Sequence, residues 1–345
     1  MKKTLIATGW VGLSLAALAD PLVLIDTHAH FQTIPFKDLE ASHRTALKQM
    51  DQMNIGKSLL MPQPFATNTP KWFYDIEDLL FAAKANPDRF AVLGGSTLNV
   101  MLHSTAAEAV DDGIRSKFRE RAQKIVSLGA VGFGEISVLH VSIPAMGANH
   151  AYEMVPADHP LLLMLADIAA ENDIPIDLHC DLVPQDMPLP ENLRANHLNP
   201  PELQGNLPAF KRLLAHNPKT KIVWVHVGFE PLLTRHPKRV RALLQEHPNL
   251  FMSFRLNRGH PSPAAAMDMD GKLKSSWIDL VHEFPDRFML GSDAFYDRNG
   301  IARGSGDDGM NNLRGLITQL PEPLAAQVAS ENAIRLYRLK ALATQ

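Results

Sequence analysis

Five apolar segments of the sequence each run directly into side chains that can bind a metal ion. The first supplies two histidines and the others one residue each, giving His28, His30, Glu135, His179, His226 and Asp293 in chain order. Divalent ions such as Zn²⁺ favour imidazole nitrogens and carboxylate oxygens, and sites without thiolates are typical of catalytic rather than structural metal centres. These residues therefore predict a catalytic site for a divalent metal, with Zn²⁺ as the expected ion.

Each of these residues also has a structural explanation when it is taken alone. A single histidine at the end of a strand is more often hydrogen-bonded within the core than bound to a metal. Glu135 alone could pair with an arginine, and Asp293 could cap the turn that follows it. The coincidence at five strand ends favours a shared site. The remaining eleven of the 15 histidines, among them His43 and His103, are interpreted as structural or solvated.

The segments that must position these residues alternate between short apolar runs and longer runs with helical spacing, which is typical of a parallel sheet with crossover helices. Eight such pairs in roughly 320 residues favour an α/β fold of the (β/α)8 TIM-barrel type, as a single domain with inserted loops. An open dinucleotide-binding sheet is disfavoured because no Gly-x-Gly-x-x-Gly follows the first strand. The expected strands are 22–27, 57–61, 90–94, 130–134, 174–178, 221–225, 249–254 and 288–291.

In such a barrel the carboxyl ends of all strands meet on one face, so the six side chains are expected to converge there. Because alternate residues of a strand share a face, Asp26, His28 and His30 should point toward the barrel axis, with Ile25 and the residues between them toward the helices. The same alternation predicts that Cys180, the only cysteine, is buried among the helices rather than reactive.

The first residues of the chain are expected to be a targeting signal. Two lysines precede an uncharged apolar stretch with small residues at Ala17 and Ala19, a pattern that predicts a signal peptide over 1–19 and a mature barrel domain over 20–345. The alternative, an uncleaved anchor, would need about 20 uninterrupted apolar residues. The mature protein is expected to be exported, without membrane attachment, and periplasmic if its source is a Gram-negative bacterium.

Composition narrows the classes of partner. With 46% hydrophobic residues the chain can bury a large core, and one cysteine excludes an internal disulfide. The balance of 34 basic and 37 acidic residues leaves no broad basic surface for nucleic acid, so a small-molecule substrate is expected. Residues 181–207 contain five prolines and are expected to form a stiff loop over the barrel mouth, either a lid or a surface excursion. The sequence leaves assembly into a homo-oligomer open.

The order of these ligands on successive strands resembles the amidohydrolase superfamily of metal-dependent hydrolases, over nearly the whole mature chain. The segments 86–90 and 331–337 are similar to phrases of its amidohydrolase-2 branch. For that branch the resemblance implies one metal ion, with His226 as a catalytic residue. The ligands implied for this ion are His28, His30, His179 and Asp293.

Glu135 is similar instead to the bridging glutamate of TatD-type and phosphotriesterase-like relatives, in which it joins two metal ions. This resemblance implies one ion on His28, His30, Glu135 and Asp293, and a second on Glu135, His179 and His226. Two ions are favoured, because a carboxylate facing four imidazoles otherwise lacks an explanation.

The expected mechanism uses water activated by the metal, since a divalent ion lowers the pKa of bound water to about 7. Asp293 would orient this water, take its proton and pass it to the leaving group. His226 would polarise the substrate oxygen if only one ion binds. Arg255 and Tyr296 are candidate substrate-binding residues, although Arg255 could equally pair with a carboxylate.

Three functions remain open at this stage. The leading hypothesis is hydrolysis of an ester, lactone, amide or phosphoester of a small molecule. The second is a metal-dependent decarboxylase, a lyase activity of the amidohydrolase-2 branch, which a mononuclear site and an arginine that binds a carboxylate would favour. The third is a non-catalytic exported protein that binds metal or solute, which predicts a closed coordination shell.

Overall fold

The computed structural model describes residues 22–69, 71–143, 150–195, 197–229, 231–256, 262, 264–304 and 306–342. The predicted signal peptide over 1–19 lies outside the described residues. Among those that are described, no helix combines the length and the apolar character that crossing a membrane requires.

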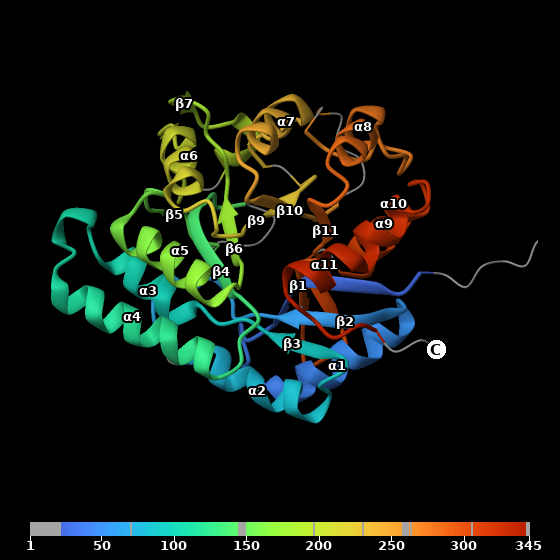
Figure 1. The fold of residues 1–345 in the computed structure, drawn as a ribbon, viewed down its shortest axis with the longest axis horizontal. Helices are drawn as coiled ribbons and strands as arrows, with labels where there is room; N and C mark the ends of the chain where they lie inside the picture. Colours follow the sequence, from blue (N-terminus) through green and yellow to red (C-terminus); the bar gives the residue numbers. More distant parts are fainter. Residues whose placement is uncertain are drawn as a thin grey trace, which may run out of the picture.

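A ring of parallel strands forms the centre of the described chain (Figure 1). Around the ring, the strands follow the order β3-β2-β1-β11-β10-β9-β6-β4, and a parallel bridge between Gly94 and Phe133 closes it. The strands are β1 (Leu24–Phe31), β2 (Ile55–Leu60), β3 (Phe90–Val92), β4 (Phe133–His140), β6 (Ile176–Cys180), β9 (Ile222–Val227), β10 (Leu250–Phe254) and β11 (Phe288–Leu290). Each overlaps one expected strand, so the (β/α)8 barrel is confirmed.

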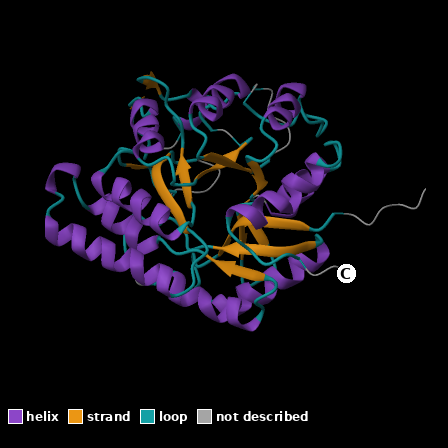
Figure 2. Cartoon of the chain, viewed as in Figure 1, coloured by secondary structure: helices purple, strands orange, loops and turns teal. Residues whose placement is uncertain are grey.

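Helices surround the ring (Figure 2). They are α1 (Leu39–Gln52), α2 (Ile76–Ala85), α3 (Ser96–Ser104), α4 (Asp112–Ser127), α5 (Pro160–Asn172), α6 (Leu207–His216), α7 (Pro237–Glu246), α8 (Ser275–Glu283), α9 (Gly306–Ile317), α10 (Leu324–Ala326) and α11 (Asn332–Leu336). The carboxylates of Asp38, Asp75 and Asp111 accept backbone N–H groups where α1, α2 and α4 begin. These caps satisfy donors that a helix start leaves without partners.

Short strands extend the barrel beyond its carboxyl end. β5 (Glu153–Met154) pairs antiparallel with β4, and β12 (Ala294–Tyr296) pairs with β1 and with β13 (Ala302–Gly304). The long proline-rich loop forms its own hairpin from β7 (Met187–Pro188) and β8 (Glu202–Leu203). Its leucines pack with Leu139 at the end of β4, so the loop is anchored to the barrel rim.

Two hydrophobic clusters pack on the two sides of the strand ring. The larger lies between strands and helices and includes Cys180, as expected. The smaller gathers residues from strands around the ring, and Ala333, Leu336 and Tyr337 of the carboxyl-terminal segment pack into it.

Ile25 belongs to the smaller cluster, so the prediction that it faces the helices is wrong. The register of β1 against β2 shifts between Asp26 and Ala29, which breaks strict alternation while His28 and His30 still face the site. The carboxylate of Asp26 is fully buried and accepts the backbone N–H and the hydroxyl of Ser292. Asp26 therefore ties β1 to the segment that carries Asp293 and does not join the imidazoles.

Candidate metal centre

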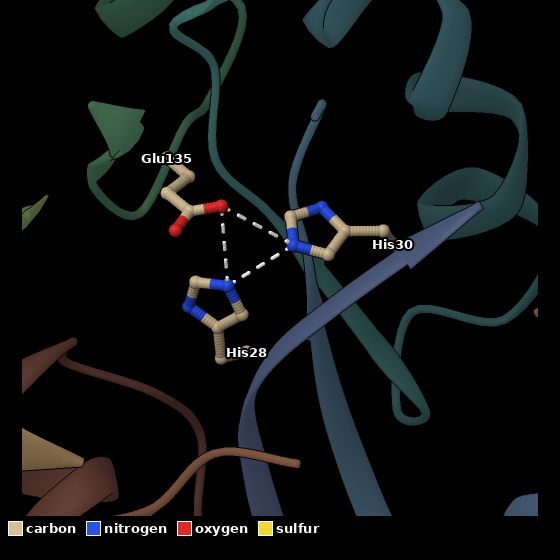
Figure 3. A group of neighbouring side chains, drawn as sticks. All are labelled: His28, His30 and Glu135. Carbon is tan, nitrogen blue, oxygen red and sulfur yellow. Dashed lines mark hydrogen bonds and ion pairs between the residues drawn. The ribbon is translucent and has the colours of Figure 1, made fainter. Parts of the chain in front are cut away.

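The six predicted ligands come together at the carboxyl ends of the strands. Glu135 lies at the centre of the group: its Oε1 is 2.9 Å from His179 Nδ1 and 3.1 Å from His226 Nε2. Its Oε2 is 3.5 Å from the Nε2 atoms of both His28 and His30. Figure 3 shows the side chains of His28, His30 and Glu135 pointing toward one another. One carboxylate thus contacts all four imidazoles.

His28 and His30 both direct Nε2 toward the centre. His28 Nδ1 donates to the carboxylate of Asp177 at 2.8 Å, and His30 Nδ1 donates to the Met61 carbonyl at 3.1 Å. In a neutral ring that donates from Nδ1, Nε2 carries a lone pair. The two Nε2 atoms are only 3.0 Å apart, and both lie beside the Glu135 carboxylate. A cation between them is the arrangement that such donors fit.

Asp293 lies next to the Nε2 atoms of His28 and His30. Its Oδ1 is 3.4 Å from His30 Nε2 and 3.7 Å from His28 Nε2, while Oδ2 pairs with Arg255 Nη1 at 3.0 Å. Burial alone would raise the pKa of Asp293, but the charge of Arg255 holds it well below its ordinary value. Asp293 is therefore ionised at neutral pH, with Oδ1 facing the imidazoles.

His179 and His226 form the other half of the centre. Burial opposes a charge on His179, but hydrogen bonds with Asp181 and Glu135 outweigh it and raise the pKa to about 9. Burial lowers the pKa of His226 to about 3, so this ring is neutral. His226 Nδ1 is buried and has no hydrogen-bond partner among the described residues. A buried nitrogen without a partner costs free energy unless another group binds there.

The backbone at two ligands adopts a conformation that is uncommon for residues with side chains. His226 has φ of 62° and Asp293 has φ of 55°, both in the left-handed region. Buried Arg235 holds the turn after β9, because its guanidinium donates to the carbonyls of Val225 and His226. Strained conformations at the ends of barrel strands are typical of functional sites.

The geometry yields two overlapping ligand sets that share Glu135. His28, His30 and Glu135 form one group, and Glu135, His179 and His226 form another, while Asp293 groups with His28 and His226. Within each group the candidate ligand atoms lie within 4.8 Å of one another. The centre thus contains candidate sites for divalent ions, with imidazole and carboxylate donors only.

Two of the predicted site residues belong to the surroundings of this centre. Arg255 pairs with Asp293 and stacks over Phe229, with 4.0 Å between its guanidinium carbon and the ring centroid. This ion pair matches the alternative interpretation of Arg255, in which it binds a neighbouring carboxylate rather than the substrate. Tyr296 is 1% exposed and packs in the larger hydrophobic cluster, and its contact with substrate stays a prediction.

Several residues near the ligands were not predicted. Asp177 hydrogen-bonds His28, and Asp181 contacts His179. Asp177 could have been found from the sequence, because it lies on the same strand face as His179. His140 and His150 were interpreted as structural or solvated, but the His140 ring lies 4.7 Å from that of His179 and 4.4 Å from that of His150. No sequence signal placed these two, because His140 is the last residue of β4 and His150 lies in the connection to β5.

Hydrogen bonds with the backbone fix the tautomers of His140 and His150. His140 Nδ1 donates to the Ala151 carbonyl, which leaves its Nε2 as an acceptor in the neutral ring. His150 Nδ1 accepts the backbone N–H of Ile143, so its Nε2 carries the hydrogen. Burial lowers the pKa of both rings, and that of His150 falls to about 3. The neutral His140 ring therefore lies between that of His179 and the neutral ring of His150.

The barrel and its ligands define a class of protein with a metal centre at the carboxyl ends of the strands. The family model described as Amidohydrolase, the amidohydrolase-2 group, matches residues 25–339. The chain belongs to this amidohydrolase family, and it is an enzyme. The resemblance seen in the sequence is confirmed.

Solved structures share the fold at low sequence identity. A 2,6-dihydroxybenzoate decarboxylase in complex with 2,6-dihydroxybenzoate matches with a TM-score of 0.52 and 16% identity, over 92% of this chain and 99% of that chain. A dihydroxybenzoic acid decarboxylase from Polaromonas sp. JS666, with bound manganese and 2-nitroresorcinol, matches with a TM-score of 0.50 and 15% identity, over 92% and 98%. A search of curated proteins found no match. These likenesses show the fold.

Proposed function

We propose that this enzyme is a hydrolase in which Glu135 bridges two divalent metal ions, with Zn²⁺ as the expected metal. Its substrate is an ester, lactone, amide or phosphoester of a small molecule. The position of Glu135 carries the proposal: its two oxygens lie within 3.5 Å of nitrogens of four histidines that come from three strands. A buried carboxylate at the centre of four imidazoles fits a shared ligand between two ions.

Bound divalent ions would supply a nucleophile from water at neutral pH and polarise the substrate oxygen. Asp293 supplies the proton acceptor, because Oδ2 is held by Arg255 while Oδ1 faces the imidazoles. Arg255 keeps this carboxylate ionised, and its Oδ1 would take the proton from water and pass it to the leaving group. His28 and His30 keep their Nε2 atoms free for metal because their Nδ1 atoms are hydrogen-bonded elsewhere.

Decarboxylation of an aromatic acid is the second candidate. Two of the similar structures are described as decarboxylases of dihydroxybenzoic acids, and one of them contains manganese. Such a reaction would need a group that binds the substrate carboxylate, and Arg255 is the candidate. Its pairing with Asp293 favours hydrolysis instead, because Arg255 already has a carboxylate partner.

One assay distinguishes the two candidate functions, hydrolysis and decarboxylation. Metal-free protein is reconstituted with Zn²⁺ or Mn²⁺ and incubated with a panel of aryl esters, lactones, anilides, phosphoesters and hydroxybenzoic acids. Hydrolysis is followed by release of the alcohol, amine or acid, and decarboxylation by release of carbon dioxide. The proposal predicts metal-dependent hydrolysis of a panel member; metal-dependent release of carbon dioxide without hydrolysis would contradict it.

A further inference from the structure

The segment that follows α11 reaches a predicted metal ligand through a buried carboxylate. The Tyr337 hydroxyl donates to Asp177 Oδ2 at 3.0 Å, and the other carboxylate oxygen, Oδ1, accepts from His28 Nδ1 at 2.8 Å. Tyr337 is 2% exposed, and Asp177 and His28 are 0% exposed. The two oxygens of Asp177 thus link the Tyr337 hydroxyl to His28 Nδ1, and a buried chain of hydrogen bonds runs from the carboxyl-terminal segment to the metal centre.

The path joins elements that are distant in the sequence. Tyr337 is 160 residues from Asp177, and Asp177 is 149 residues from His28. Tyr337 packs in the interior cluster together with Ile25 of β1, and Figure 1 shows α11 next to this strand. The tyrosine hydroxyl is therefore held by the packing of its own ring.

His28 and His30 are held in different ways. The Nδ1 partner of His30 is a neutral backbone carbonyl, whereas that of His28 is a side-chain carboxylate. A carboxylate on the outer nitrogen fixes the ring orientation and makes the inner nitrogen a stronger ligand. A carboxylate side chain, unlike a backbone carbonyl, can rotate, so it needs a second contact to hold its oxygen toward His28. Tyr337 supplies that contact.

We propose that Tyr337 is a positioning residue for metal binding: it fixes Asp177, which in turn orients His28 so that Nε2 faces the metal. The proposal rests on the proposed metal centre and adds a residue from the carboxyl-terminal segment to it. Because Tyr337 acts through Asp177, its effect on metal binding disappears once Asp177 no longer holds His28.

Zinc titration of the metal-free full-length protein, in competition with a chromophoric chelator, tests the proposal. Tyr337→Phe keeps the ring and removes the hydroxyl, and Asp177→Asn keeps the shape and removes the charge. We expect Asp177→Asn to weaken zinc binding about 10- to 100-fold and Tyr337→Phe about tenfold at the ion that uses His28. Tyr337→Phe added to Asp177→Ala, which leaves no side-chain oxygen to accept from His28, should bind zinc no more weakly than Asp177→Ala alone.

Leu336→Val is the matched control, because Leu336 is buried in the same cluster and contacts the metal path through packing only. It should lower the resistance of the metal-free protein to urea and leave zinc affinity unchanged. The visible spectrum of the Co²⁺-loaded protein should change in Tyr337→Phe and Asp177→Asn but not in Leu336→Val.

Two results would overturn the proposal: an unchanged zinc affinity in Tyr337→Phe, or a tenfold further loss when this change is added to Asp177→Ala. The proposed function is tested separately, by the number of zinc ions that the unmodified protein binds. A single ion would contradict the Glu135 bridge, and the shift in its affinity would still decide the role of Tyr337. Absence of zinc binding would overturn both.

Discussion

Asp293 and Glu135 are both buried carboxylates of one centre, yet their partners give them different tasks. Burial raises the pKa of each, and this is outweighed for Glu135 chiefly by the charge of His28 and for Asp293 by that of Arg255. Glu135 is surrounded by imidazoles on both oxygens, whereas Asp293 has one oxygen held by an arginine and one directed into the site. Pairs of acids in different surroundings are typical of sites that divide metal binding and proton transfer.

This difference predicts that Asp293→Asn abolishes turnover without unfolding the protein. An amide has nearly the same shape but cannot accept the proton from water, so kcat should fall about 10²- to 10⁴-fold. Steady-state kinetics on the substrate found in the panel, together with a circular-dichroism melting curve, check this. Asp279→Asn, on the exposed face of α8, is the matched control. Substantial residual activity in Asp293→Asn would refute the role of this residue.

At the scale of elements, the β4–β5 hairpin places a further acid, Glu153, at the rim of the site. Glu153 lies opposite His140 in the antiparallel register, and opposite residues of such a pair point to the same face. His140 contacts His179, so Glu153 lies on the hairpin face that borders the metal centre. Burial raises the pKa of Glu153 to about 7, although the charge of His179 partly offsets this.

The raised pKa predicts how Glu153 affects stability. Between its ordinary pKa of 4.5 and about 7, the folded protein binds more protons at this carboxyl than the unfolded chain, so this residue destabilises the fold as pH rises through that window. Glu153→Gln removes the effect. We expect it to raise the free energy of unfolding by about 1–2 kcal/mol more at pH 8 than at pH 5, after allowance for partial exposure.

Urea denaturation at the two pH values measures this change. Glu202→Gln, at an exposed position of β8, should show no such difference between pH 5 and pH 8. An equal gain for Glu153→Gln at both values would show that its carboxyl titrates normally in the fold.

At the scale of the whole molecule, the sequence predicted the barrel and the convergence of six candidate ligands, because both follow from local periodicity. Each strand end is visible as an apolar run that stops at a polar residue, and the fold itself brings these ends together. Contacts that depend on tertiary placement were not visible: the register shift that turns Ile25 inward, the approach of His140 to His179, and the reach of Tyr337 to Asp177. Nothing in the local pattern near these residues distinguishes them from other buried positions.

The predicted signal peptide remains a proposal at this scale. Cleavage after Ala19 would leave Asp20 as the first residue of the exported protein. Expression of the full chain in a Gram-negative host, followed by intact-mass measurement of the periplasmic fraction, tests it. We expect a mass that corresponds to residues 20–345, and replacement of Ala19 by a bulky residue should block processing. Recovery of the uncleaved chain from the cytoplasm alone would contradict export.

The most direct test of the central claim is the number of metal ions bound per chain. Elemental analysis of the purified mature protein, reconstituted with Zn²⁺ and freed of excess metal, should give two ions for the unmodified protein. Glu135→Gln should give one, because the amide cannot hold both ions as the carboxylate between four imidazoles does. One ion in both proteins would contradict the bridge and favour the mononuclear decarboxylase alternative.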